Sequence, residues 1–183
     1  MTGWIIFAGI VIIVFFWFVG TYNMLVRYRN MVRESFSTMD VYMKKRYDLI
    51  PNLVETVKGY ANHESATLER VIEARNSAQN SKSLEERAED ETLLNGSLKS
   101  LFALSEAYPD LKANTNFMDL QKQLQSVEVD IANSRKYYNA VVRDYNIKIE
   151  SFPSSIIASA FNFDKEQQFE IAILERENVK VRF

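Results

Sequence analysis

The strongest hydrophobic pattern in this chain is an apolar run close to its N-terminus. Residues 4–19 are all apolar, and the first charged side chain is that of Arg27. A helix over residues 4–26 would be about 34 Å long at about 1.5 Å per residue, which is enough to cross the hydrocarbon core of a bilayer. No basic stretch precedes the run, and residues 20–22 make a poor signal-peptide cleavage site. The pattern therefore predicts an uncleaved transmembrane anchor over residues 1–26.

A second pattern, in the C-terminal half, repeats at alternating steps of three and four residues. This spacing is a heptad seam, typical of a long helix that packs against other helices. The seam consists of Phe117, Leu120, Leu124, Val127, Ile131, Ser134, Tyr138, Val141, Tyr145, Lys148 and Phe152. Ser134 is small enough to be buried, whereas Lys148 must extend its amine to solvent or leave its place to Ile149. We predict a long helix that ends at Phe152-Pro153.

A similar stripe continues from the anchor into the polar part of the chain. It consists of Val32, Phe36, Met39, Met43, Ile50, Val54, Val57, Ala61, Leu68 and Val71. The stripe predicts a first helix that leaves the membrane without a break and continues past Val71. Pro51 lies inside it, and proline removes one hydrogen bond and clashes with the carbonyl four residues earlier. We expect a kink near residues 47–50, and a helix end before Pro51 is the alternative.

Polar residues and proline divide the rest of the chain. Residues 76–83 are rich in Ser, Asn and Gln and suit a turn, after which Ser83 and Glu86 fit a capping box. The next helix would turn five residues inward and end at Tyr108-Pro109. These residues are Leu94, Leu98, Leu101, Ser105 and Tyr108. Asn114 or Thr115 would cap the long helix, and a short helix would follow Pro153.

The C-terminal stretch differs from the helices before it. Residues 164–177 are amphipathic, with Phe169 and Ile173 on the apolar side, and residues 179–183 alternate apolar and basic side chains, which could form a strand. The predicted fold class is all-α: a single transmembrane helix continues into an antiparallel bundle of long helices. The predicted domains are an anchor (residues 1–26), a bundle (residues 27–163) and an amphipathic tail that could be a subunit contact (residues 164–183).

The charge around the anchor predicts its orientation. Between residues 27 and 46 there are six basic and two acidic side chains, a net charge of +4. By the positive-inside rule this side of the anchor is cytoplasmic, and the N-terminus is outside. The first three basic residues, Arg27, Arg29 and Arg33, could also bind anionic lipid, or they could serve only as a topology signal.

Composition argues against several classes of function. The whole chain has a net charge of −2, which leaves −6 beyond residue 46, so we expect no nucleic-acid partner. There is no cysteine, and His63 is the only histidine; Thr67 stands where a second zinc-binding histidine would have to be. Single glycines such as Gly59 and Gly96 form no phosphate loop. We expect no catalytic residue, no metal site and no cofactor, and we interpret the acidic run 89–91 as a solvated helix face.

Several short motifs, in this order and spacing, resemble the LemA family. They are Tyr22-Asn23, the run RYDLIPNLV at residues 46–54, Gly59-Tyr60, His63-Glu64, Arg75, the run YPDL at residues 108–111, the run RKYYN at residues 135–139, Tyr145-Asn146 and Phe152-Pro153. The resemblance extends from the anchor to about Phe163. It implies a membrane-anchored bacterial protein with a cytoplasmic bundle of long antiparallel helices, at the inner (cell) membrane, and it implies no particular activity.

The polar members of these motifs have two interpretations. They could be interlocking layers that set the register of the helices, or a recognition surface for a peptide or lipid headgroup. The candidates are Arg46, Tyr47, Asp48, Pro51, Asn52, Tyr108, Pro109, Arg135, Tyr138, Asn139, Tyr145, Asn146 and Pro153. A kink at Pro51 would free the carbonyl near Tyr47, and Asn52 or Arg135 could donate to it.

Two functional hypotheses follow, and neither is enzymatic. The first is a scaffold that self-associates at the cytoplasmic face of the membrane, with the tail as the subunit contact, so that its partners are lipid and further copies of the chain. The second is an adaptor that presents a helical groove to another membrane protein, such as a protease of envelope proteins.

Overall fold

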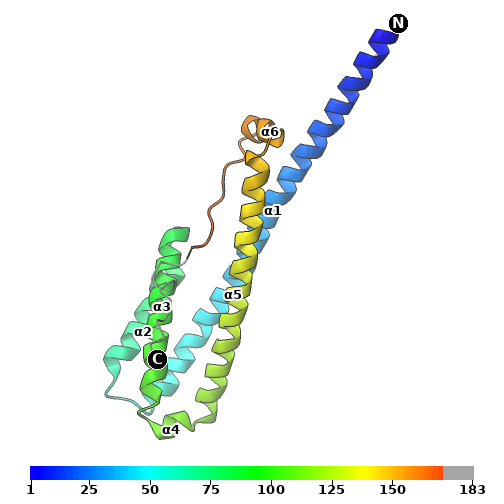
Figure 1. Cartoon of the computed structure of the whole chain (residues 1–183). Helices are drawn as coiled ribbons and strands as arrows, with labels where there is room; N and C mark the ends of the chain where they lie inside the picture. Colours follow the sequence, from blue (N-terminus) through cyan, green and yellow to red (C-terminus); the bar gives the residue numbers. More distant parts are fainter. Residues whose placement is uncertain (171–183) are drawn as a thin grey trace, which may run out of the picture. The chain divides into compact units, whose positions relative to one another are not determined.

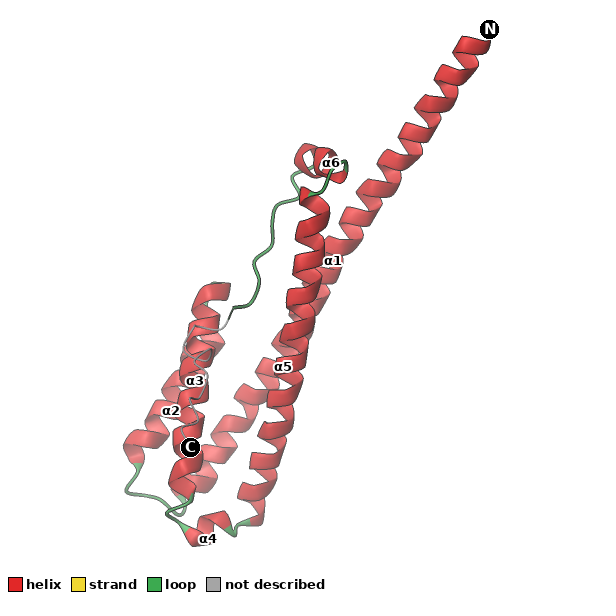
Figure 2. Ribbon diagram, in the orientation of Figure 1, coloured by secondary structure: helices red, strands yellow, loops and turns green. Residues whose placement is uncertain are grey.

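The computed structural model describes residues 1–170, and within this range the chain forms helices and connecting segments, with no strand. The helices are α1 (Thr2–Lys58), α2 (Ser65–Asn80), α3 (Leu84–Ser105), α4 (Pro109–Lys112), α5 (Thr115–Glu150) and α6 (Ser154–Ala160) (Figures 1 and 2). The predicted all-α class is confirmed. By length and composition α1 can cross a membrane, and none of its most apolar window is buried within the chain.

Helix α1 runs through Pro51 without ending, but it stops much earlier than the apolar stripe predicted. It ends at Lys58, and the chain turns back over residues 59–64 before α2 begins. The amides of Tyr60 and Ala61 both donate to the carbonyl of Val57, which closes the turn. The prediction of one helix past Val71 was wrong because apolar spacing reports which side chains are buried, and the returning helix α2 buries Leu68 and Val71 as well.

The turn predicted over residues 76–83 is also shorter in the structure. Helix α2 continues to Asn80, whose side-chain amide donates to the carbonyl of Asn76 at 2.8 Å, so only residues 81–83 connect α2 to α3. Ser83 caps α3 as predicted, because its hydroxyl accepts from the amide of Glu86 at 3.1 Å. The other half of the capping box is shifted, since Glu86 accepts from the amide of Lys82 at 2.7 Å.

Helix α5 carries the predicted seam. Asn114 is its cap, accepting from the amide of Phe117 at 2.9 Å. The seam residues from Phe117 to Tyr145 are buried except Leu120, and Ile149 takes the place of the half-exposed Lys148. Phe152 was predicted to be in the core and is 83% exposed. The helix ends at Glu150, so the seam no longer controls where Phe152 points.

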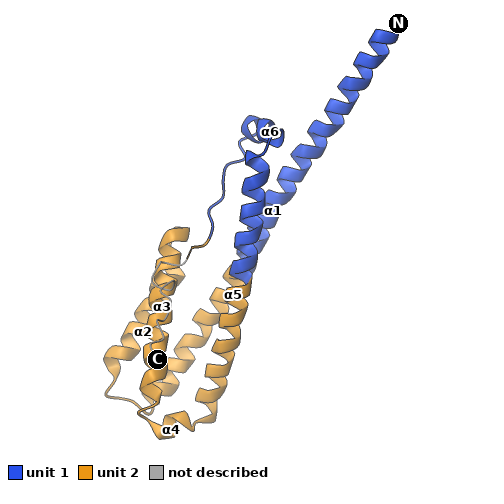
Figure 3. Ribbon diagram, viewed as in Figure 1, with its two compact units in different colours: residues 1–38, 134–168 blue, residues 39–133, 169–183 orange. Residues whose placement is uncertain are grey.

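The chain divides into two compact units (Figure 3). Unit 1 consists of residues 1–38 and 134–168, which include the apolar part of α1, the second half of α5, and α6. The described part of unit 2 consists of residues 39–133 and 169–170, in which the end of α1 and the start of α5 pack with α2, α3 and α4. The boundaries predicted for anchor, bundle and tail stay predictions.

The segment after α6 is not helical. Asn162 adopts a left-handed backbone with φ 54°, a conformation that asparagine tolerates, and residues 163–170 then continue without regular secondary structure. Phe169, on the apolar side of the run over residues 164–177, is buried within the chain. Ile173 and the predicted strand over residues 179–183 lie outside the described residues.

Candidate functional site

A buried arginine connects three helices of unit 2. Arg46 on α1 is 1% exposed, and its guanidinium forms an ion pair with the carboxylate of Glu91 on α3. Its Nη1 atom also donates to Asn95 Oδ1 at 2.8 Å and to Glu128 Oε1 on α5 at 2.5 Å. A buried guanidinium is tolerated only when it is paired and hydrogen-bonded, and this ion cluster joins α1, α3 and α5 inside unit 2.

Tyr47 continues the same polar layer. Its hydroxyl donates to the carboxylate of Glu91 and lies 3.3 Å from the carbonyl oxygen of Ala78 on α2. Burial raises the pKa of Tyr47, and the positive charge of Arg46 beside it only partly opposes this effect. The phenol is therefore neutral and acts as a hydrogen-bond donor.

The carbonyl of Tyr47 would be unpaired in an ordinary helix at this point, because Pro51 has no amide hydrogen to donate to it. The sequence correctly predicted that this carbonyl lacks its usual donor, but it did not name the side chain that bonds it. The Nε atom of Arg75 on α2 donates to the carbonyl of Tyr47 at 3.0 Å. Asn52 is exposed, and its own carbonyl accepts from the hydroxyl of Thr56.

Glu91 is the member of the ion cluster that the sequence interpretation placed wrongly. The acidic run 89–91 was interpreted as a solvated face, and Glu91 is 6% exposed. A signal was present: Glu91 stands three residues before Leu94 and so extends the seam of Leu94, Leu98 and Leu101 by one step. The spacing gave no such sign for the other two residues. Asn95 directly follows Leu94 of the apolar stripe on α3, and Glu128 directly follows Val127 of the heptad seam on α5, so neither continues its stripe.

The other motif residues of unit 2 lie apart from the ion cluster. Asp48 is exposed and pairs with Lys44 at 3.6 Å on the surface of α1. Tyr108 is half-buried, and its hydroxyl lies 3.4 Å from Glu64 Oε1. Pro109 occupies the first turn of α4, where a missing amide hydrogen costs nothing.

In unit 1, the motif residues of α5 hold the segment that follows α6. Asn146 bonds the backbone of Glu166 twice: its Nδ2 donates to the carbonyl at 2.9 Å, and its Oδ1 accepts from the amide at 3.0 Å. The hydroxyl of Tyr138 donates to the carbonyl of Gln167 at 2.8 Å. Together they satisfy backbone groups of a segment that has no secondary structure of its own.

The bonds from Asn146 and Tyr138 to residues 166–167 are called the clamp below, and the remaining motif residues of unit 1 are not part of it. Tyr145 is buried, and burial raises its pKa. Arg135 and Asn139 are half-buried on α5, and exposed Pro153 precedes α6. In the predicted lipid-facing cluster, Arg27 and Arg33 are exposed, but the guanidinium of Arg29 lies 4.8 Å from the centre of the Phe163 ring.

The clamp gives a pH-dependent prediction. Burial raises the pKa of Tyr138 from 10.0 to about 12. Below pH 10 the phenol is neutral in the folded and unfolded chains; between pH 10 and about 12 only the unfolded chain releases the proton, so folding stability falls over this window. In an absorbance titration of phenolate, Tyr47 and Tyr145 should contribute to the late step as well, because burial also raises their pKa. Tyr138→Phe should lower the amplitude of this step, and Tyr137→Phe, a change at the exposed neighbour, should leave it unchanged. Identical late steps in both variants would contradict the burial of this hydroxyl.

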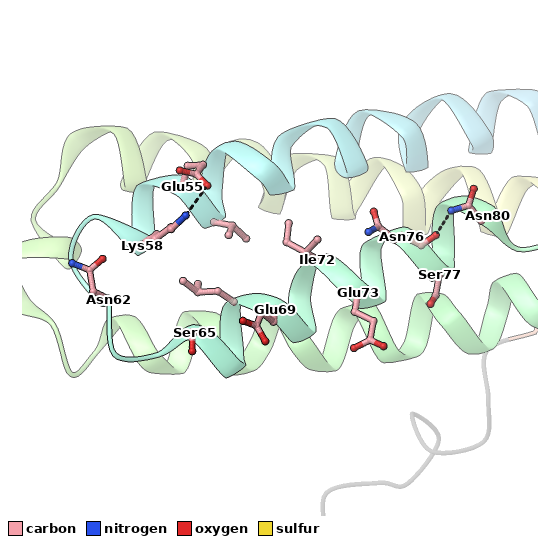
Figure 4. Close-up of a pocket in the computed structure, with 12 residues that line it drawn as sticks. Glu55, Lys58, Asn62, Ser65, Glu69, Ile72, Glu73, Asn76, Ser77 and Asn80 are labelled. Atoms are coloured by element: carbon pink, nitrogen blue, oxygen red, sulfur yellow. Dashed lines mark hydrogen bonds and ion pairs between the residues drawn. The ribbon is translucent and has the colours of Figure 1, made fainter.

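Unit 2 also carries a groove between the end of α1 and the length of α2, with a volume of about 810 Å³. Val54, Leu68 and Ile72 supply apolar surface, and Glu69 and Glu73 add negative charge. Figure 4 shows the Glu55–Lys58 ion pair along the α1 side of one end, where the charged atoms are 3.7 Å apart. No group of three His, Cys, Asp or Glu side chains within residues 1–170 is placed to hold a metal ion.

The first helix of the bundle, α1, also contains the candidate membrane span. The general class is therefore a helical-bundle protein with a candidate N-terminal membrane anchor. The sequence model of the LemA family matches residues 35–183, and the chain belongs to this family. It is 25% identical over 172 residues to Protein LemA of Metamycoplasma hominis, across 91% of this chain and 77% of that relative. The resemblance inferred from the motifs is confirmed.

Proposed function

We propose that this LemA family member is a non-enzymatic scaffold, anchored in the bacterial inner membrane by α1 and able to self-associate at the cytoplasmic face. The observation that carries the proposal is the continuity of α1, which runs from Thr2 to Lys58 and contributes both the apolar span and Arg46 of the ion cluster. No loop interrupts α1 between the apolar span and Arg46.

The contacts of the motif residues support a structural role. Arg46 is bonded to Glu91, Asn95 and Glu128, while Asn146 and Tyr138 are bonded to the backbone of residues 166–167. Side chains whose polar atoms are already bonded inside the chain are poorly available to bind a substrate. The same bonds account for the residue types. The ion cluster uses several N–H donors of the Arg46 guanidinium, the two bonds to Glu166 use the donor and the acceptor of the Asn146 amide, and the bond to Gln167 uses the hydroxyl of Tyr138.

The orientation of the anchor can be tested with reporter fusions. The net charge of +4 over residues 27–46 predicts a cytoplasmic C-terminal domain by the positive-inside rule. A reporter that fluoresces only in the cytoplasm should be active when fused after Phe183. A reporter that matures only outside the cytoplasm should be inactive there, and its activity would reverse the topology and remove the cytoplasmic partners.

Self-association through the tail is the second testable part. Residues 179–183 alternate apolar and basic side chains, and pairing with the tail of another copy would satisfy their backbone groups. Deleting residues 178–183 should reduce the particle mass measured by light scattering in detergent. The full-length protein gives the reference mass. An unchanged oligomer, or a full-length protein that is monomeric, would exclude the tail as the subunit contact.

The groove favours the adaptor as a second candidate function. An apolar floor with acidic residues at its edge is suited to an amphipathic helix that carries basic residues. A photo-crosslinking residue at Ile72, in native membranes, should join this face to one other membrane protein if the chain is an adaptor. The same residue at exposed Val129 is the control. Crosslinks from Ile72 only to further copies of the chain would favour the scaffold.

A further inference from the structure

Helix α6 and the residues on either side of it form an unusual surface. Residues 151–163 carry no charged side chain. One side of this segment is buried in unit 1, through Ile157, Ala158 and Phe163. The other side exposes Phe152, Ile156 and Phe161, and Ile156 is 60% exposed. The exposed polar side chains here are the uncharged Ser151, Ser159 and Asn162. Three large apolar side chains with no charge among them are unusual on a surface that faces water and are typical of a contact surface.

The position of this surface follows from its ring contacts with α1. The centre of the Phe161 ring lies 5.8 Å from that of Phe18 and 4.9 Å from that of Tyr22. Phe18 belongs to the apolar run, and Tyr22 stands before Arg27, the first charged residue of the chain. A side chain that packs against these two residues lies on the bilayer side of Arg27. Figure 3 shows α6 within unit 1, at the end of α5.

We propose that the α6 surface, made of Phe152, Ile156 and Phe161, is a second membrane contact that lies in the interface between headgroups and acyl chains. This inference rests on the membrane anchor of the proposed function. If α1 spans the bilayer, the contact between Phe161 and Phe18 brings α6 to the lipid, and a short uncharged helix with bulky apolar side chains is suited to that layer.

The charges near α6 agree with a lipid surface as the occupant. Arg27 and Arg33 are exposed on α1, where they can reach anionic headgroups. Arg29 is directed to the Phe163 ring, so it supports the segment that carries Phe161 rather than the lipid. The clamp on Glu166 and Gln167 holds the far side of the same segment against α5. The anchor and α6 would then fix unit 1 to the membrane at two points.

The absence of cysteine makes a direct test possible, because single cysteines can be introduced and labelled with an environment-sensitive fluorophore. The full-length chain would be reconstituted in vesicles of phosphatidylcholine and phosphatidylglycerol. Ile156→Cys reports on α6 and Val11→Cys on the middle of the anchor. The matched control is Tyr137→Cys, on α5 in the same unit, where the side chain is 55% exposed. Quenching by a lipid-bound nitroxide is compared with quenching by iodide in the water.

The label at position 156 should be quenched several-fold more by the lipid nitroxide than the label at position 137, and several-fold less by iodide. If the label at 156 behaves like that at 137 while the label at 11 is quenched by lipid, the anchor stands and the α6 contact is excluded. A label at 156 that neither agent quenches would also overturn the proposal, because protein would then cover the surface. If the label at 11 is not quenched by lipid, both the anchor and the α6 contact fail.

Discussion

Replacing Arg46 by alanine is expected to lower the free energy of unfolding by about 3–5 kcal/mol, because the carboxylate of Glu91 would remain in the core without its partner. Glu91 accepts from both Arg46 and Tyr47, and Asn95 and Glu128 would lose a donor as well. The measurement is urea unfolding of a fragment that begins at Arg27, followed by circular dichroism. Among single changes at polar positions, this one should have the largest effect.

Two further variants test whether the loss of stability comes from the ion cluster or from shortening any basic side chain in this part of α1. Lys45→Ala removes a neighbouring positive charge that is exposed, so its midpoint should stay close to that of the parent. The double variant Arg46→Met with Glu91→Leu replaces the buried pair by apolar side chains and should recover most of the lost stability. Equal midpoints for Arg46→Ala and Lys45→Ala would show that Arg46 does not pair in the core.

Truncation of the α5 seam should have an effect of similar size. Leu124 is 2% exposed, and Leu124→Ala should cost about 2–5 kcal/mol, since it removes buried methyl groups and leaves a cavity. Ile131 is buried on the same face, and Ile131→Ala should behave in the same way. The same urea unfolding of the fragment from Arg27 measures both variants.

The control for the seam lies on the same helix. Val129→Ala changes an exposed apolar side chain of α5 and should alter stability by less than about 0.5 kcal/mol. If Leu124→Ala unfolds at the same urea concentration as Val129→Ala, the seam does not mark the buried face of α5.

The seam shows how far the sequence could predict the core. Its spacing identified the buried face of α5 from Phe117 to Tyr145, because side chains three and four residues apart share one face of a helix. The prediction failed at Phe152, where the helix has already ended. Helix ends depend on a balance of small local terms, so spacing alone places them poorly.

The candidate site was predictable only in part, because its bonds join distant segments. Pro51 revealed from the sequence that the carbonyl of Tyr47 needs a donor, but the donor, Arg75, is brought there by the turn over residues 59–64. The clamp of Asn146 on Glu166 likewise depends on how the chain returns after α6. Loop geometry of this kind leaves little trace in residue spacing.

The sequence by itself determined the all-α class, the candidate anchor, the cap at Ser83, and membership of the LemA family, and it narrowed the cap of α5 to Asn114 or Thr115. These features depend on neighbours within about one helical turn, or on motifs read directly along the chain. Only the tertiary structure decided that Glu91 is buried with Arg46 and that Phe161 packs on Phe18. The reason is physical: a carboxylate or a phenylalanine side chain is stable in either surroundings, and distant helices decide which partner it meets.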